Sequence, residues 1–317
     1  MARAFGSRTI VLASFAGDLL IALAKFAAGG LGGSSAMLSE GVHSLVDTVN
    51  SVLLLYGMRR AKRPADADHP FGYGRELYFW SFMVALLVLA LGAGISFYEG
   101  LMHLRRPAPL TDARLSYAVL AVSFAFAGAS WWVAFHGIRV RKGGCGWLEA
   151  FQRSKDPSGF IELMTSTAAL VGLLLAIGGV LGSHLLHAPR ADGAASIGIA
   201  LVLAGVSVLL LRETKGLLIG EPAHPRIGDS IMAIARKEKG VSCANGVLTF
   251  QMGADQVVAN LSAEFEDGMN ADQIEQCINR IEDEVKRENR EIVALFVKPQ
   301  SARTWRERER GLRRETR

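Results

Sequence analysis

The chain has 317 residues, of which 50% are hydrophobic and only 21% are charged, a low share for a soluble protein. Its net charge of +5 calls for no nucleic-acid partner, because lysine and arginine in the cytoplasmic loops of a membrane protein account for it. The three cysteines lie far apart without a CxxC pair, a pattern that supports neither a disulfide framework nor a cysteine-based zinc site.

Long apolar runs alternate with short charged connectors from about residue 7 to residue 220, after which the composition becomes that of a soluble protein. This contrast predicts a transmembrane domain over 1–220, a small cytoplasmic domain over 221–300 and a basic, disordered tail over 301–317, which is too charged to pack. A membrane-spanning helix needs about 20 mainly apolar residues, and about six such runs are present. They cover residues 8–31, 36–58, 77–103, 115–138, 157–181 and 194–211.

Basic clusters lie at the N-terminus, between the second and third runs, between the fourth and fifth, and after the sixth. The positive-inside rule places these segments and both termini in the cytoplasm. The first apolar run has no small-residue cleavage site after a short core, so we interpret it as a retained span. We therefore expect a multi-pass protein in the lipid of a bacterial inner (plasma) membrane.

The soluble part shows the periodicities of a helix and of strands. Residues 225–239 place Ile227, Ile231 and Ile234 on one helical face, and residues 257–266 alternate as a strand with one buried face does. Asn270 is a suitable N-cap for a helix to residue 288. Further strands are expected at 247–251 and 292–297. The order helix–strand–strand–helix–strand predicts a two-layer α+β domain (αββαβ, ferredoxin-like).

His43 and Asp47 lie four residues apart in the second apolar run, so a helix puts both side chains on one face. An imidazole and a carboxylate inside a membrane are costly unless they line a polar cavity or bind a cation, although a buried pair that only ties helices together is the alternative. Glu162, in the fifth run, forms a second oxygen-rich face with Thr165 and Ser166. Its alternative is a position near the interface, in reach of cytoplasmic water.

The set of His43, Asp47 and Glu162 suits a borderline divalent ion such as Zn²⁺, Mn²⁺, Fe²⁺ or Co²⁺. In the first run, Asp18 and Lys25 share a helix face and form either an intramembrane ion pair or an accessory to the ion path.

The loop between the second and third runs has two interpretations, a weak cytoplasmic metal site and a solvated turn, and the pattern favours the turn. Its residues are Asp66, Asp68 and His69. The sequence has no GxxxxGK[ST] motif, so it does not predict transport driven directly by ATP. It also has no HExxH motif of zinc metalloproteases and no GxSxG motif of serine hydrolases.

Four stretches together resemble the cation diffusion facilitator family of zinc-transporter-like proteins. They are Gly33–Leu38, His43–Asp47, Arg63-Pro64 followed by Asp68–Glu76, and Asp192-Gly193 followed by Ala195–Ile197. The resemblance covers nearly the whole chain. It implies a proton-coupled antiporter that exports divalent cations, Zn²⁺ above all, from the cytoplasm. It further implies a homodimer joined through the cytoplasmic domain, with no prosthetic group, no enzymatic activity and no nucleic-acid partner.

The resemblance also implies a transport site that joins the second and fifth spans. His43 and Asp47 match the half of that site in the second span, whereas Glu162 and Ser166 occupy the positions of the half in the fifth. Because one expected carboxylate is missing there, either Glu162 replaces it, the site is weaker or the metal differs, and Asp18 is a candidate to compensate. The altered half motivates an alternative function as a non-transporting metal sensor or scaffold. A membrane enzyme using the same metal is a third possibility, against which the lack of a nucleophile–base set counts.

Overall fold

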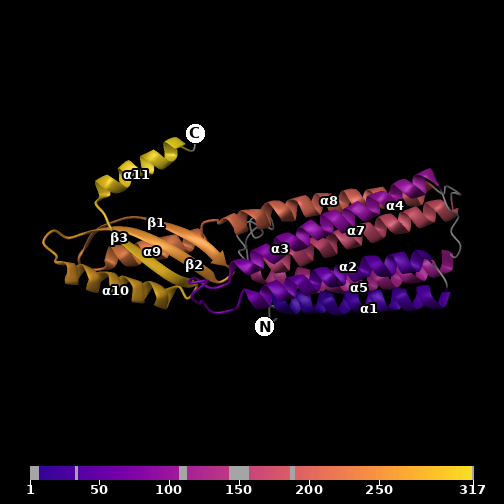
Figure 1. Cartoon of the computed structure of the whole chain (residues 1–317), viewed down its shortest axis with the longest axis horizontal. Helices are drawn as coiled ribbons and strands as arrows, with labels where there is room; N and C mark the ends of the chain where they lie inside the picture. The colour runs from indigo at the N-terminus through magenta and orange to yellow at the C-terminus, as the bar shows by residue number, and fades with distance from the viewer. Residues whose placement is uncertain (1–6, 33–34, 107–112, 143–156, 186–189, 316–317) are drawn as a thin grey trace. The chain divides into compact units, whose positions relative to one another are not determined.

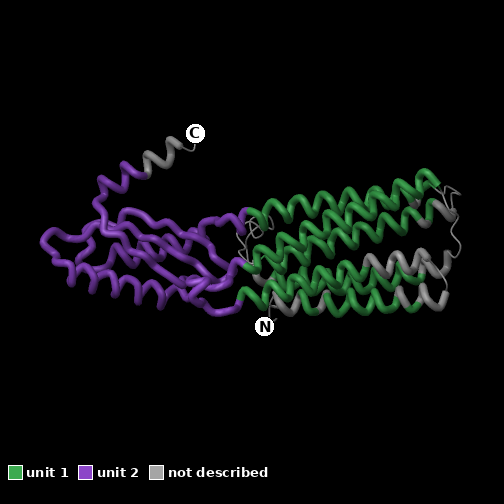
Figure 2. The backbone as a smooth tube through the Cα atoms, viewed as in Figure 1, with its two compact units in different colours: residues 1–61, 76–215 green, residues 62–75, 216–317 purple. Residues whose placement is uncertain are grey.

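A computed structural model describes the backbone of residues 7–32, 35–106, 113–142, 157–185 and 190–315 and most of their side chains. The chain forms two compact units (Figure 2). The first contains residues 1–61 and 76–215, and the second contains residues 62–75 and 216–317. The second unit therefore takes in a loop that the sequence assigned to the membrane domain.

Long helices that run side by side build the first unit (Figure 1). They are α1 (Ser7–Gly32), α2 (Ser35–Arg60), α3 (Arg75–Leu87), α4 (Gly94–Arg105), α5 (Ala113–Lys142), α7 (Pro157–Leu185) and α8 (Arg190–Ile219). Within the described ranges, four segments are long and apolar enough to cross a membrane. They are Arg75–Arg105, Ala118–Arg139, Pro157–Gly179 and Gly193–Ile219. These four agree with the third to sixth predicted spans.

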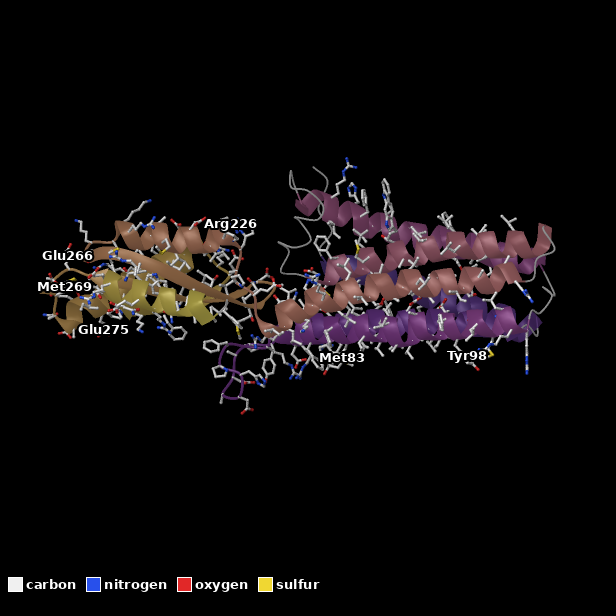
Figure 3. The ribbon with its side chains drawn as sticks, turned by 90° about the horizontal axis from the view of Figure 1, so that it is seen from above. Met83, Tyr98, Arg226, Glu266, Met269 and Glu275 are labelled. Carbon is white, nitrogen blue, oxygen red and sulfur yellow. The ribbon has the colours of Figure 1, made fainter. Side chains whose placement is uncertain are left out.

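The outer surface of this unit is apolar, as expected of helices that face lipid. Tyr98 is 61% exposed and Leu201 is 66% exposed. Figure 3 shows the labelled side chains of Met83 and Tyr98 on the outside of the helices that carry them. An apolar outer surface beside an apolar core is the pattern of a membrane bundle, not of a soluble one.

The third predicted span is interrupted in its middle. The six residues Val88–Ala93 form a π-helix, η1, between α3 and α4. Such π turns are rare and occur frequently at functional positions. Past this turn, α4 crosses α8 closely, because a Cβ on Gly100 would lie 2.9 Å from the carbonyl oxygen of Gly193. Small residues allow helix backbones in membranes to approach in this way.

An ion pair joins the end of α2 to the start of α3. Arg60 Nη2 lies 2.7 Å from Glu76 Oε1, and Trp80 Nε1 donates a hydrogen bond of 2.7 Å to the other oxygen of the same carboxylate. These contacts hold together the two helix ends from which loop 62–75 emerges.

The second unit has the helix and strand order that the sequence predicts. Its elements are α9 (Pro225–Lys237), β1 (Val241–Gly253), β2 (Gln256–Phe265), α10 (Ala271–Glu288), β3 (Ile292–Pro299) and α11 (Ala302–Glu315). The sheet order is β1-β2-β3, with β1 antiparallel and β3 parallel to the central β2. Val257, Ala259 and Leu261 of β2 are fully buried, in a core shared with Ile231 of α9 and Ile281 of α10. The predicted alternation of β2 is therefore confirmed.

The last helix, α11, differs from the predicted disordered tail. Ser301 Oγ accepts a hydrogen bond from the Thr304 amide, as an N-cap does. Trp305 packs so closely on Gly246 of β1 that a Cβ there would clash with the indole ring. The charge pattern of the tail predicted no packing, but one tryptophan and one cap are enough to order the start of this helix.

Loop 62–75 belongs to the second unit because of contacts that its sequence pattern does not predict. Gly74 lies against Gly253 of β1, where neither residue has room for a Cβ. The Arg75 guanidinium lies 4.7 Å from the centroid of the Phe250 ring, a cation–π contact. The short loop is thereby fixed to the sheet, although its chain neighbours on both sides are helices of the first unit.

Candidate metal site in the helical unit

A cavity of about 370 Å³, lined by apolar side chains with polar ones among them, lies within the helical unit. Residues of every helix of this unit line it. Four of the lining side chains are carboxylates. They are Asp18, Asp47, Glu99 and Glu162. Serine, threonine and asparagine side chains add neutral oxygens, and no described lysine, arginine or histidine lines the cavity. Four carboxylates inside an apolar bundle form an environment that attracts cations.

The predicted pair on the second span lies on α2. Asp47 lines the cavity, and so does Leu54, two turns further along the same helix face. His43 belongs to α2 by its backbone, but its side chain lies outside the described residues. The ligand role of the pair therefore stays a prediction.

The predicted face on the fifth span lies on α7. Glu162 is only 6% exposed, and Ser166 Oγ donates a hydrogen bond of 3.4 Å to Glu162 Oε1. Thr165 also lines the cavity, but its hydroxyl donates backwards to the Ile161 carbonyl oxygen at 2.9 Å. This local bond leaves the Thr165 oxygen a weaker candidate ligand than the carboxylate of Glu162.

Asp18 of α1 lines the same cavity. Its Oδ2 accepts a hydrogen bond of 3.3 Å from Ser51 Oγ, and Ser51 stands one helical turn after Asp47. The carboxylate of α1 therefore approaches the face of α2 that carries the predicted site. The side chain of Lys25, its predicted ion-pair partner, lies outside the described residues.

Two residues that line the cavity were not predicted as site residues from the sequence. Glu99 is an ionisable residue inside the predicted third span, and this alone is a sufficient signal for a functional position. Asn50 lies three residues after Asp47, at a spacing that returns to the same helix face. Both line the cavity.

The four carboxylates do not form a complete coordination site for one metal ion. No cluster of three or more histidine, cysteine, aspartate or glutamate side chains suited to one ion exists among the described residues. A cation bound in the cavity would therefore use neutral oxygens as well, or His43.

The predicted loop site is a hydrogen-bonded turn in the second unit. Asp66 Oδ1 accepts hydrogen bonds from the amides of Asp68 and His69, at 3.1 and 2.8 Å, and Oδ2 accepts one from the Tyr73 hydroxyl at 2.7 Å. These bonds, that of Tyr73 first, lower the pKa of the Asp66 carboxyl below its ordinary value. The geometry agrees with the turn that the pattern favours, since both oxygens of Asp66 already accept hydrogen bonds.

Comparison with known proteins agrees with this geometry. Residues 11–219 match the cation efflux transmembrane domain. The chain is 30% identical over 236 residues to "Proton-coupled zinc antiporter SLC30A9, mitochondrial" of Xenopus laevis, covering 74% of this chain and 42% of that protein. It is 27% identical over 236 residues to "Metal tolerance protein C4" of Arabidopsis thaliana, covering 74% and 51%. It is 26% identical over 237 residues to "Manganese efflux system protein MneP" of Bacillus subtilis, covering 72% and 74%.

The chain thus spans less than half the length of the Xenopus antiporter. The matched domain nevertheless covers well over half of the chain, including every residue that lines the cavity. The chain therefore belongs to the cation diffusion facilitator family, whose members are multi-pass membrane transporters and not enzymes.

Proposed function

We propose that this protein is a proton-coupled antiporter that exports divalent metal cations, Zn²⁺ first among them, from the cytoplasm. The observation that carries the proposal is the cavity inside the helical unit, which four carboxylates from different helices line. Buried carboxylates in a membrane are costly, and binding a transported cation offsets part of this cost. The proton-coupled zinc antiporter among the relatives supports the same cargo and coupling.

The proposed transport site consists of His43 and Asp47 on α2 with Glu162 and Ser166 on α7. The Ser166 hydroxyl holds one oxygen of Glu162, so that the carboxylate is oriented before an ion arrives. Asp18 is the proposed accessory carboxylate, because Ser51 holds it beside the face of α2 that carries Asp47.

Proton coupling follows from competition for the same atoms. An imidazole or carboxylate must lose its proton before it binds a metal, so protons that enter from the outside favour metal release. When the site next opens to the cytoplasm, where the proton activity is lower, the ligands lose these protons and bind the next ion. Alternating access of one site to the two sides is then sufficient for exchange.

The finer architecture belongs to the same proposal. We expect six spans, with α1 and α2 as the first two, both termini in the cytoplasm of a bacterial cell, and a ferredoxin-like cytoplasmic domain. The cytoplasmic domains of two protomers would pair and hold a homodimer together. The sheet of each domain leaves Leu248 and Phe296 about half exposed, and the second copy would cover them.

Transport by the purified protein in proteoliposomes tests the proposal. Asp47→Asn keeps the shape of the side chain and removes its charge, so the initial rate of Zn²⁺ uptake should fall at least about 100-fold. Ser81→Ala is the matched control, since Ser81 is buried in α3 outside the cavity lining, and it should transport normally. Wild-type rates in Asp47→Asn would reject the site. A wild-type protein that binds metal without moving it would instead support a sensor or scaffold.

Manganese export is the second candidate function. The described part of the cavity lining supplies oxygen atoms and neither nitrogen nor sulfur ligands from histidine or cysteine, and oxygen ligands suit Mn²⁺. One relative is named as a manganese efflux protein. Parallel flux assays with Zn²⁺, Mn²⁺, Fe²⁺, Co²⁺ and Cd²⁺ separate the candidates.

A further inference from the structure

Asn50 is a buried polar residue whose side chain is not satisfied in the described structure. It lines the cavity from α2 and is only 8% exposed. Its Oδ1 has no hydrogen-bond partner among the described residues. Of the buried side-chain oxygens and nitrogens that lack a partner in the described part of the chain, this atom is the one whose residue lines the cavity. A buried amide oxygen without a hydrogen-bond partner is unusual in proteins, and such an oxygen can coordinate a cation.

The surroundings of Asn50 are rich in oxygen. Its Cα is about 4.5 Å along the helix axis from that of Asp47, since each helical residue adds about 1.5 Å. The next residue, Ser51, donates its hydroxyl to Asp18 Oδ2 at 3.3 Å. Less than one and a half turns of α2 thus bring together an amide oxygen, a hydroxyl and carboxylates from two helices.

The chemistry of these atoms discriminates between cations. Carboxylate, carbonyl and water oxygens suit Mn²⁺, which accepts six ligands, whereas Zn²⁺ prefers four ligands that include imidazole nitrogen or thiolate sulfur. An amide oxygen also carries no proton that a metal must displace. It therefore strengthens the binding of an oxygen-seeking ion at any pH at which the neighbouring carboxylates are ionised.

We propose that Asn50 Oδ1 and the Asp18 carboxylate, held by Ser51, form an oxygen-only cation position in the cavity that favours Mn²⁺ over Zn²⁺. This position lies one helical turn from Asp47. It rests on the proposed function, because it refines which ions the same cavity accepts. Selectivity would then come from two neighbouring positions, one with the His43 imidazole and one without nitrogen.

Equilibrium binding to the full chain in detergent tests this position. Isothermal titration with Mn²⁺ and with Zn²⁺ compares the wild type with Asn50→Leu, which keeps the branched shape of the side chain and removes the oxygen. The Kd for Mn²⁺ should rise about tenfold or more, and that for Zn²⁺ less than about threefold. An unchanged Mn²⁺ Kd, or equal losses for both ions, would overturn the proposal.

Asn50→Asp keeps the test decisive if Asn50→Leu fails to fold. A carboxylate at this place should bind Mn²⁺ more tightly than the amide, so Mn²⁺ should raise the Tm of Asn50→Asp by more than it raises the Tm of the wild type. An equal or smaller rise contradicts the position. Ser207→Ala is the matched control, because Ser207 Oγ is also buried without a partner among the described residues but does not line the cavity. Its affinities for both ions should equal those of the wild type.

Flux and binding together separate this proposal from the transport function. Wild-type proteoliposomes without metal flux, alongside the expected loss of Mn²⁺ binding in Asn50→Leu, would reject transport and leave the Asn50 position standing. Normal flux with an unchanged Mn²⁺ Kd in Asn50→Leu would reject the Asn50 position alone.

Discussion

Glu162 and Asp66 are two carboxylates of this chain that differ in what surrounds them. Glu162 is buried in the bundle and accepts a hydrogen bond from Ser166. Asp66 lies at the surface and accepts bonds from two backbone amides and the Tyr73 hydroxyl. A buried carboxylate beside neutral oxygens favours a cation, whereas one saturated by donors in a turn favours structure. Residue type alone does not separate these roles.

The hydrogen bonds around Asp66 allow a prediction of how its pKa changes when the Tyr73 hydroxyl is removed. Tyr73→Phe removes the strongest of the bonds that lower the pKa of Asp66, so the pKa should move up towards its ordinary value of 3.8. Because the folded pKa is below the unfolded one, the stability that Asp66 contributes is present above pH 3.8 and is lost as the pH falls through the lowered folded value.

A carboxyl ¹³C NMR titration with labelled aspartate measures this shift. Tyr98→Phe makes the same chemical change on the exposed outer side of α4 and should leave the Asp66 titration in place. A Tyr73→Phe protein whose Asp66 titrates as in the wild type would show that the hydroxyl does not set the pKa.

At the scale of elements, α10 begins with a complete capping box. The Asn270 side chain accepts from the Gln273 amide at 2.9 Å, and the Gln273 side chain accepts from the Asn270 amide at 2.9 Å. Two backbone donors that the helix start would leave unpaired are thereby satisfied. The sequence pattern predicted this cap, because both partners are local to one turn.

Removing the cap should loosen the C-terminal unit. Asn270→Ala should cost about 1 kcal/mol of stability. Cys277 of α10 is fully buried, so alkylation of its thiol in the full chain reports opening of this unit and should accelerate about fivefold. Measurements at one pH are required, because burial raises the pKa of the Cys277 thiol.

Two comparisons control this experiment. Gln276→Ala changes an exposed position of the same helix and should leave the rate within about twofold. The exposed Cys243 should react equally fast in all variants. An unchanged Cys277 rate in Asn270→Ala would mean that the cap does not limit opening.

On the scale of the whole molecule, the first unit joins every one of its helices around one cavity. Transport through such a bundle requires the cavity to open to each side in turn. Both the π-helix η1 and the close crossing of α4 with α8 are next to it. The proposed proton coupling is a property of this whole arrangement and not of one residue.

A pH gradient across proteoliposomes tests that coupling. With an acidic interior, protons that leave should drive Zn²⁺ inwards, so uptake should be several times faster than at equal pH. Collapse of the gradient with a proton–potassium exchanger should remove the acceleration. Asp47→Asn liposomes provide the leak control, since they keep the gradient and should lose the transport. Uptake by the wild type that ignores the gradient would contradict antiport.

Much of the fold was predictable because its signals are local. Apolar runs of the right length predicted the four helical segments that are long and apolar enough to span a membrane, and period-two burial predicted β2. The start of α11 was not predictable from its charge pattern, since Trp305 of that helix packs on a residue of β1 that lies far away in the chain. Contacts of the same distant kind fix loop 62–75 to the sheet.

The candidate site, like the fold, was predictable only where its signals are local in the sequence. The sequence by itself determined that ionisable residues such as Asp47 and Glu162 lie inside apolar runs, because the cost of burying a charge is a property of the residue and its neighbours in the chain. Only the tertiary structure decided that Asp18, Glu99 and Asn50 line the same cavity as that pair. Which side of a helix faces a shared cavity depends on how all the helices pack against one another, and that packing is not a local property of any one of them.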